Sequence, residues 1–210
     1  MNSRFAGILV AGAMAALSGC ATMSGEECLT SDWRAIGFED GAQGYASNRL
    51  ADRRKACAKH GVTPDFQAYQ DGRTEGLKEY CQPQRGFNLG ERGGRYNGVC
   101  PSHLEPGFLD AFRTGAQLHT LRSNVNSVNY RISAKQAELD DLEDTVRSKE
   151  ARLIADETTT QDRVLILADL KELSERKGQL EAEIFDLVED RVLHEQHLAN
   201  YEAMLVDSGY

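Results

Sequence analysis

The stretch Tyr69–Cys81, YQDGRTEGLKEYC, places two glycines, Gly72 and Gly76, one turn apart in a segment with an otherwise helical pattern. A glycine inside a helix costs about 1 kcal/mol relative to alanine. Positions i and i+4 lie on the same face of a helix. Two glycines at this spacing therefore predict close backbone contact with another helix, as in small-x-x-x-small pairs.

An aromatic residue, Tyr69, also stands three positions before Gly72. Three other places between residues 31 and 116 have the same aromatic–glycine spacing. The aromatic–glycine pairs are Phe38–Gly41, Tyr69–Gly72, Phe87–Gly90 and Phe112–Gly115. Each glycine also has a small partner four residues away, in the pairs Gly37–Gly41, Gly72–Gly76, Gly90–Gly94 and Ala111–Gly115. The copies are 31, 18 and 25 residues apart, which is too irregular for a solenoid. We predict tightly crossed helices at these glycines; the alternative is that some of them line a groove where a ligand approaches the backbone.

The second half of the chain has a different pattern, because apolar residues from Leu118 onward recur at alternating steps of three and four. About five heptads on each side of a polar turn near residues 155–162 indicate an antiparallel coiled-coil hairpin over residues 117–206. A turn centred near Thr158 places the seam lysine Lys135 opposite residues 181–183 and Lys177 opposite residues 139–141, where carboxylates occur. The same heptads also allow pairing between two copies of the chain.

The N-terminus has the features of a secretory signal over residues 1–19, with Arg4 before an apolar run that is too short to span a bilayer. The residues Leu17–Cys20, LSGC, resemble the lipobox of bacterial lipoproteins, in which the cysteine becomes the acylated first residue. Several acyl chains on Cys20 would anchor the protein stably to a membrane. The next residue is Ala21 and not Asp, which by resemblance to enterobacterial lipoproteins implies the outer membrane and not the inner one. We therefore expect the protein at the periplasmic face of the outer membrane, with residues 20–30 as the tether.

Four cysteines remain, Cys28, Cys57, Cys81 and Cys100, and in an oxidising compartment they predict two disulfides with three connectivities. If two helices pair around the turn GVTP at residues 61–64, Cys57 and Cys81 lie roughly 20 Å apart, too far to bridge. Of the two connectivities that remain, we favour Cys28–Cys57 with Cys81–Cys100.

No sequence motif indicates catalysis, a cofactor or a metal, and the spacing of His194 and His197 is one residue short of a zincin pair. Residues 117–210 carry 20 acidic and 11 basic residues, which argues against nucleic acid as a partner. We therefore expect a non-enzymatic protein with an envelope protein as its partner. An alternative hypothesis is a binding module for an envelope glycan or lipid head group, with Trp33, Arg49, Arg53 and Arg54 as its surface.

Three segments resemble a family of proteobacterial lipoproteins, the domain of unknown function two-seven-nine-nine. They are DWRAIGFEDGAQGY (32–45), RRKACAKHGVTPDFQAYQDGRTEGLKEYC (53–81) and GFNLGERGGRYNGVCP (86–101). The resemblance covers about residues 32–115 and implies no catalytic residues. The expected fold is all-α, with a small disulfide-bonded helical domain at residues 31–116 and the coiled-coil hairpin after it.

Overall fold

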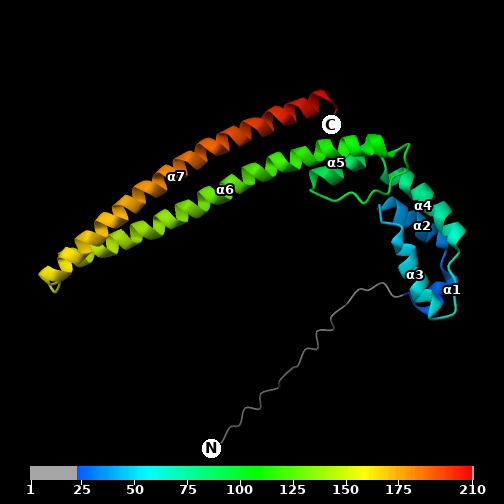
Figure 1. Ribbon diagram of the computed structural model, residues 1–210, viewed down its shortest axis with the longest axis horizontal. Coiled ribbons are helices and arrows are strands. Elements are labelled where there is room, and N and C mark those ends of the chain that lie inside the picture. Colours follow the sequence, from blue (N-terminus) through cyan, green and yellow to red (C-terminus); the bar gives the residue numbers. More distant parts are fainter. Residues whose placement is uncertain (1–22, 210) are drawn as a thin grey trace, which may run out of the picture. The chain divides into compact units, whose positions relative to one another are not determined.

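A computed structural model describes residues 23–209, so the predicted signal peptide and Cys20 lie outside the described residues. The described part is all-helical, without a strand, as the sequence predicted (Figure 1). Its helices are α1 (Gly25–Thr30), α2 (Trp33–Ala42), α3 (Asn48–Ala58), α4 (Phe66–Tyr80), α5 (Pro83–Glu91), α6 (Glu105–Ile154) and α7 (Thr160–Asp207).

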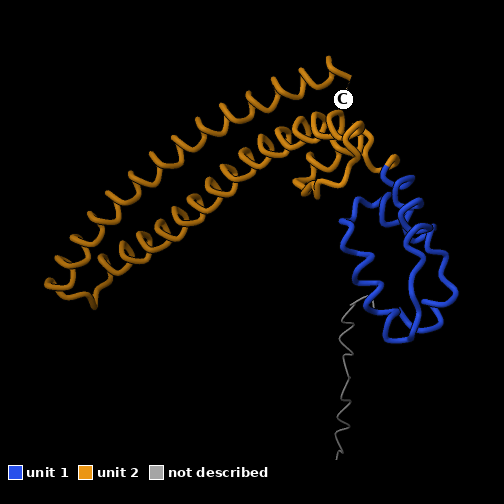
Figure 2. The backbone as a smooth tube through the Cα atoms, turned by 45° about the vertical axis from the view of Figure 1, so that its right-hand side comes forward, with its two compact units in different colours: residues 1–77 blue, residues 78–210 orange. Residues whose placement is uncertain are grey.

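The described residues form two compact units, unit 1 and unit 2, which divide between Leu77 and Lys78 (Figure 2). The boundary falls inside α4, so the region 31–116 that the sequence suggested as one domain is divided between the units. Each unit contains one pair of crossed helices and one disulfide. Unit 2 also contains the long hairpin.

The helix ends of unit 1 follow from its local sequence. Ser24 and Glu27 form a reciprocal capping box at the start of α1. The Asp32 carboxylate accepts hydrogen bonds from the first backbone amides of α2. After α2 the chain reverses at Gly44, whose φ of 69° is a conformation that glycine adopts without a Cβ penalty.

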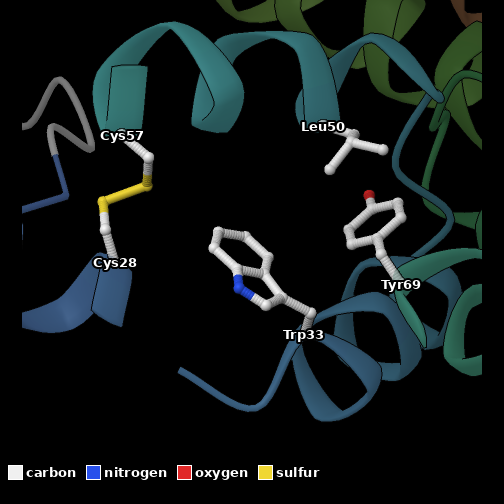
Figure 3. Packing of buried hydrophobic residues seen from close by; sticks show 5 residues of the cluster. All are labelled: Cys28, Trp33, Leu50, Cys57 and Tyr69. Carbon is white, nitrogen blue, oxygen red and sulfur yellow. A yellow bond between two sulfur atoms is a disulfide. The ribbon is translucent and has the colours of Figure 1, made fainter. Parts of the chain in front are cut away.

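The core of unit 1 forms around the Cys28–Cys57 disulfide, which joins α1 to α3. Trp33, Leu50 and Tyr69 complete this cluster from α2, α3 and α4 (Figure 3). Tyr69 and Cys57 are fully buried. A unit of this size has a small core, so a disulfide within it adds substantially to stability.

Four glycines form the crossing of α2 and α4. A Cβ added to Gly37 or Gly41 would lie 2.0 or 2.4 Å from the carbonyl oxygen of Tyr69 or Arg73 on α4. Reciprocally, a Cβ on Gly72 or Gly76 would lie 1.9 or 2.1 Å from a carbonyl oxygen of α2. The backbones therefore touch, as the spacing of these glycines predicts.

Unit 2 has a second crossing, between α5 and α6. The sequence prediction was wrong for one of its glycines, Gly94. Cβ atoms added to Gly86, Gly90 and Gly115 would lie 2.1–2.3 Å from carbonyl oxygens of the facing helix, and Ala111 is fully buried beside them. Gly94, which was paired with Gly90, lies beyond the end of α5 and contacts Leu89 of its own turn. Because α5 begins at Pro83, the i,i+4 partner of Gly90 on the crossing face is Gly86.

The two crossings are copies of one arrangement. Gly37 faces the carbonyl of Tyr69 as Gly86 faces that of Phe108, and both aromatic side chains are fully buried. Gly44 and Gly93 end the first helix of each copy with φ of 69° and 68°, and both donate backbone hydrogen bonds to the glycine three residues earlier. A disulfide closes each copy, Cys28–Cys57 in unit 1 and Cys81–Cys100 in unit 2. The expected disulfide pairing is thus the one in the structure.

The rest of unit 2 is the antiparallel hairpin of α6 and α7 (Figure 1). Seam residues of both helices are buried, namely Leu118, Val128, Ile132, Ile166, Leu180, Leu187 and Leu205. At the turn, Thr159 caps α7, and the Arg163 guanidinium donates to the carbonyls of Ala155 and Thr158. These contacts hold the turn within the predicted range.

Ion pairs across the seam fix the register of the hairpin. Lys135 binds Glu183 at 2.8 Å, within the predicted range. Lys177 binds Glu143 at 2.6 Å, two residues beyond the predicted position. The neighbouring lysine lowers the pKa of the Glu143 carboxyl below its usual value. Charged seam positions reduce the apolar contact but disfavour shifted alignments of the two helices.

Candidate interaction surfaces

The predicted ligand surface of Trp33, Arg49, Arg53 and Arg54 does not form as a single exposed patch. Trp33 is buried in the core of unit 1. Arg53 turns inward and donates two hydrogen bonds to the buried carboxylate of Asp40, at 2.9 and 3.3 Å. Arg54 is exposed, and it points about 100° away from Arg53 around the helix. The Arg49 side chain is 42% exposed.

Asp40 is the centre of a polar network inside unit 1. The Tyr69 hydroxyl donates to Asp40 at 2.9 Å, and Arg49 lies 3.8 Å from the same carboxylate while its guanidinium covers the Tyr45 ring. Burial and then the hydrogen bond to Asp40 raise the pKa of Tyr69 to about 12. A buried carboxylate with these partners links α2, α3 and α4, so two of the predicted ligand-binding arginines are structural.

An exposed apolar stripe on α7 is the feature of the hairpin that its fold does not use. Its main members share one heptad position, and all are more than half exposed: Val164, Phe185, Val192 and Val206. Leu167, which is 54% exposed, and Val188, which is partly buried and also packs against the seam cluster of α6 and α7, follow three residues after this heptad position. We call these six residues the α7 stripe. From Phe185 to Val206 it extends about 31 Å along the helix.

The matching position on α6 is polar through most of its length, with His119, Asn126, Ser133, Asp140 and Arg147, and becomes apolar only at Ile154. The stripe is therefore confined to α7. Lys171, Gly178 and Ala199 interrupt it at the same heptad position. A group of exposed apolar side chains on one helix face often marks an interaction site.

The α7 stripe is flanked by negative charge. Residues 181–207 contain eight acidic residues and one basic residue, Arg191, which lies 3.6 Å from Glu195. Within the described part of the chain, Asp186, Glu189 and Asp190 have no ion pair, and they lie beside Phe185, Val188 and Val192 in sequence. A surface of this kind attracts an apolar helix with positive flanks and repels another acidic one.

The described residues include no group of three His, Cys, Asp or Glu side chains arranged to hold a metal ion. None of the described helices combines the length and apolarity that a bilayer span requires.

Comparison with known proteins gives one match. Residues 32–117 match the model of a family described as protein of unknown function (DUF2799). The match agrees with the family resemblance that the sequence indicated over about residues 32–115. No curated protein and no solved structure matches the chain.

The DUF2799 region contains both helix crossings and the helices that form them, from α2 to the first part of α6. Of the four disulfide cysteines, only Cys28 precedes it. The remainder of the α6–α7 hairpin, with the α7 stripe, follows it. The family match thus covers the two similar crossings. The α7 stripe lies outside the matched residues.

The sequence reasoning missed the α7 stripe although a signal was present. Phe185, Val192 and Val206 repeat at multiples of seven, one residue after the seam position Ile184. The seam already uses two heptad-spaced apolar rows on each helix, so this third row is one more than a two-helix hairpin requires.

Proposed function

We propose that this protein is a lipid-anchored, non-enzymatic protein of the cell envelope whose hairpin docks a partner protein along the α7 stripe. The lipobox at Leu17–Cys20 supports the anchor, and its position before Ala21 supports the periplasmic face of the outer membrane. Two disulfides suit an oxidising compartment. The single observation that supports an interaction role is the α7 stripe, because its exposed side chains are not buried between α6 and α7.

The partner that fits is an amphipathic helix whose apolar face is flanked by Lys or Arg. Such a helix would pack on the stripe as a third helix beside α6 and α7. Its basic residues would neutralise Asp186, Glu189 and Asp190. A second copy of α7 would bring the same acidic flanks together, which disfavours homo-oligomerisation through this face. Anionic lipid is disfavoured for the same reason.

Photo-crosslinking in intact cells tests the docking proposal. A photoreactive residue at Val192 should yield one discrete adduct, and the same residue at Ser133, on the outer face of α6, should yield none. Mass spectrometry of the adduct should identify a helical peptide with Lys or Arg beside an apolar row. An adduct between two copies of the chain would replace this proposal by a homo-oligomer, and the absence of any adduct at Val192 would overturn it.

Charge reversal gives a second test with a matched control. Asp186→Lys with Glu189→Lys should reduce the Val192 adduct several-fold, because both charges face the proposed basic flanks. Asp140→Lys with Asp141→Lys makes the same change in net charge on exposed positions of α6 and should leave the yield unchanged.

The anchor is tested independently of the hairpin. Cys20→Ala should move the protein from the membrane fraction to the soluble periplasmic fraction and abolish fatty-acid incorporation. A wild-type protein that is found only in the soluble fraction contradicts the anchor and leaves the docking surface unaffected.

A further inference from the structure

The end of α4 and one face of α5 form a groove in unit 2 that is lined by hydrogen-bond donors. Tyr80, Arg85, Asn88 and Arg92 line it together with Leu89, and its volume is about 380 Å³. Positions 85, 88, 89 and 92 follow the i, i+3, i+4, i+7 spacing of one helix face. The groove has no acidic residue in its lining.

The donors of this groove lack acceptors within the described chain. The guanidinium groups of Arg85 and Arg92 make no ion pair and no hydrogen bond among residues 23–209. Glu91, the acid next to Arg92 in sequence, is instead bound by Arg122 at 2.8 Å. The Asn88 side-chain oxygen accepts from Gln84 at 3.3 Å, which leaves its amide nitrogen to donate.

Tyr80 is held in place as a further donor. Its ring stacks on Phe108, with 5.3 Å between the ring centroids. Burial raises the pKa of Tyr80 and the nearby Arg85 opposes this effect, so the hydroxyl remains protonated at neutral pH. Among the described residues this hydroxyl has no hydrogen-bond partner.

The duplicated crossing provides an internal comparison for this groove. In unit 1 the positions equivalent to Arg85, Asn88 and Arg92 hold Ile36, Glu39 and Gln43, and Ser31 stands in place of Tyr80. The crossing therefore folds without arginine at these positions, and an acid replaces one of the donors. The groove lined by donors therefore occurs only in the second crossing. The fold of the crossing does not require it, because unit 1 forms the same crossing without these donors.

We propose that this groove binds the anionic group, a phosphate or a carboxylate, of a small polar ligand. Two guanidinium groups, an amide and a hydroxyl offer charge-assisted hydrogen bonds to acceptor oxygens. The volume lies in the range of small-ligand sites and suits a fragment of the size of an acidic sugar or a head group. The two arginines are about 10 Å apart along the helix. They can therefore bind one anion from opposite sides or bind two acidic groups of one ligand.

Isothermal titration calorimetry on the purified protein tests the groove with three probes, inorganic phosphate, citrate and phosphatidylglycerol vesicles. We expect saturable binding of at least one probe and at least a tenfold loss of affinity in Arg85→Ala with Arg92→Ala. Arg113→Ala with Arg131→Ala removes the same two charges from exposed positions of α6 and should change affinity less than twofold. Tyr80→Phe should weaken binding and leave the helix content, measured by circular dichroism, unchanged.

The probes also distinguish the source of the anion. Binding of free phosphate or citrate supports a soluble ligand, whereas binding of the vesicles alone supports a lipid head group, and both agree with the proposal. No saturable binding of any probe, or equal losses in the two double variants, would overturn it. The Arg85, Arg92 and Tyr80 substitutions lie outside the α7 stripe, so their effect is separate from the docking proposal.

Discussion

The glycine contacts predict that a single methyl group at the α2–α4 crossing destabilises unit 1. In Gly37→Ala the new Cβ would lie 2.0 Å from the carbonyl oxygen of Tyr69 and 3.0 Å from the amide nitrogen of Arg73. Ordinary contacts of a Cβ begin near 3.4 Å. Because the atoms that it meets belong to backbone, no side chain can move aside, and the two helices must separate by about 1 Å or more.

The expected net loss is about 1–2 kcal/mol. Alanine gains about 1 kcal/mol over glycine in helix propensity, whereas overpacking costs roughly 1–3 kcal/mol and more when backbone must shift. Separation also weakens the contacts of Gly41, Gly72 and Gly76 at the same crossing. A unit of about 55 described residues has a total stability of only about 3–8 kcal/mol, so the loss is a large fraction of it.

Urea denaturation followed by Trp33 fluorescence measures this loss, because Trp33 is the only tryptophan and lies in the core of unit 1. The midpoint should fall in Gly37→Ala. Gly178→Ala is the control, since Gly178 is exposed within α7 and an added Cβ meets no atom within 4 Å. It should leave the Trp33 transition unchanged and stabilise α7 by up to about 1 kcal/mol. An unchanged or higher midpoint in Gly37→Ala would refute the backbone-contact argument.

Three further predictions concern the disulfide, the polar core and the hairpin. Replacing Cys28 and Cys57 by serine should lower the stability of unit 1 by about 3–4 kcal/mol in the same urea assay, because the disulfide closes a loop with a sequence separation of 29. Since the pKa of Tyr69 is raised from 10.0 to about 12, its contribution to stability is present below pH 10 and lost between pH 10 and 12; Tyr69→Phe should remove this loss from the Trp33 transition. The pKa of Glu143 is lowered by Lys177 and that of Glu138 by Arg176, so the hairpin should lose stability as pH falls below the ordinary value of 4.5. Glu143→Gln should reduce that acid sensitivity in melts followed by circular dichroism, and an identical pH profile in the variant would contradict the role of the ion pair.

Part of this architecture was predictable because it depends on local periodicity. Heptad spacing is a property of the chain itself, so Leu118, Leu180 and Leu187 could be assigned to a seam and the turn located near residue 158. The pair Gly72 and Gly76 likewise indicated a contact face before its partner was known. Helix length excluded a Cys57–Cys81 bridge but left two connectivities, and the structure has the one that the sequence analysis favoured.

The errors arose where a side chain's role depends on the facing element. Gly94 matched the spacing of a crossing glycine, but α5 ends before it and Gly86 takes its place. Trp33 and Arg53 had the composition of a ligand surface, yet the helix orientations bury the first and direct the second to Asp40. The α7 stripe and the donor groove of Arg85 and Arg92 emerged only once the exposed faces were known. Sequence determined which residues share a helix face, because that follows from 3.6 residues per turn. Tertiary structure decided which faces meet, because burial and ion pairing depend on the helix that packs opposite.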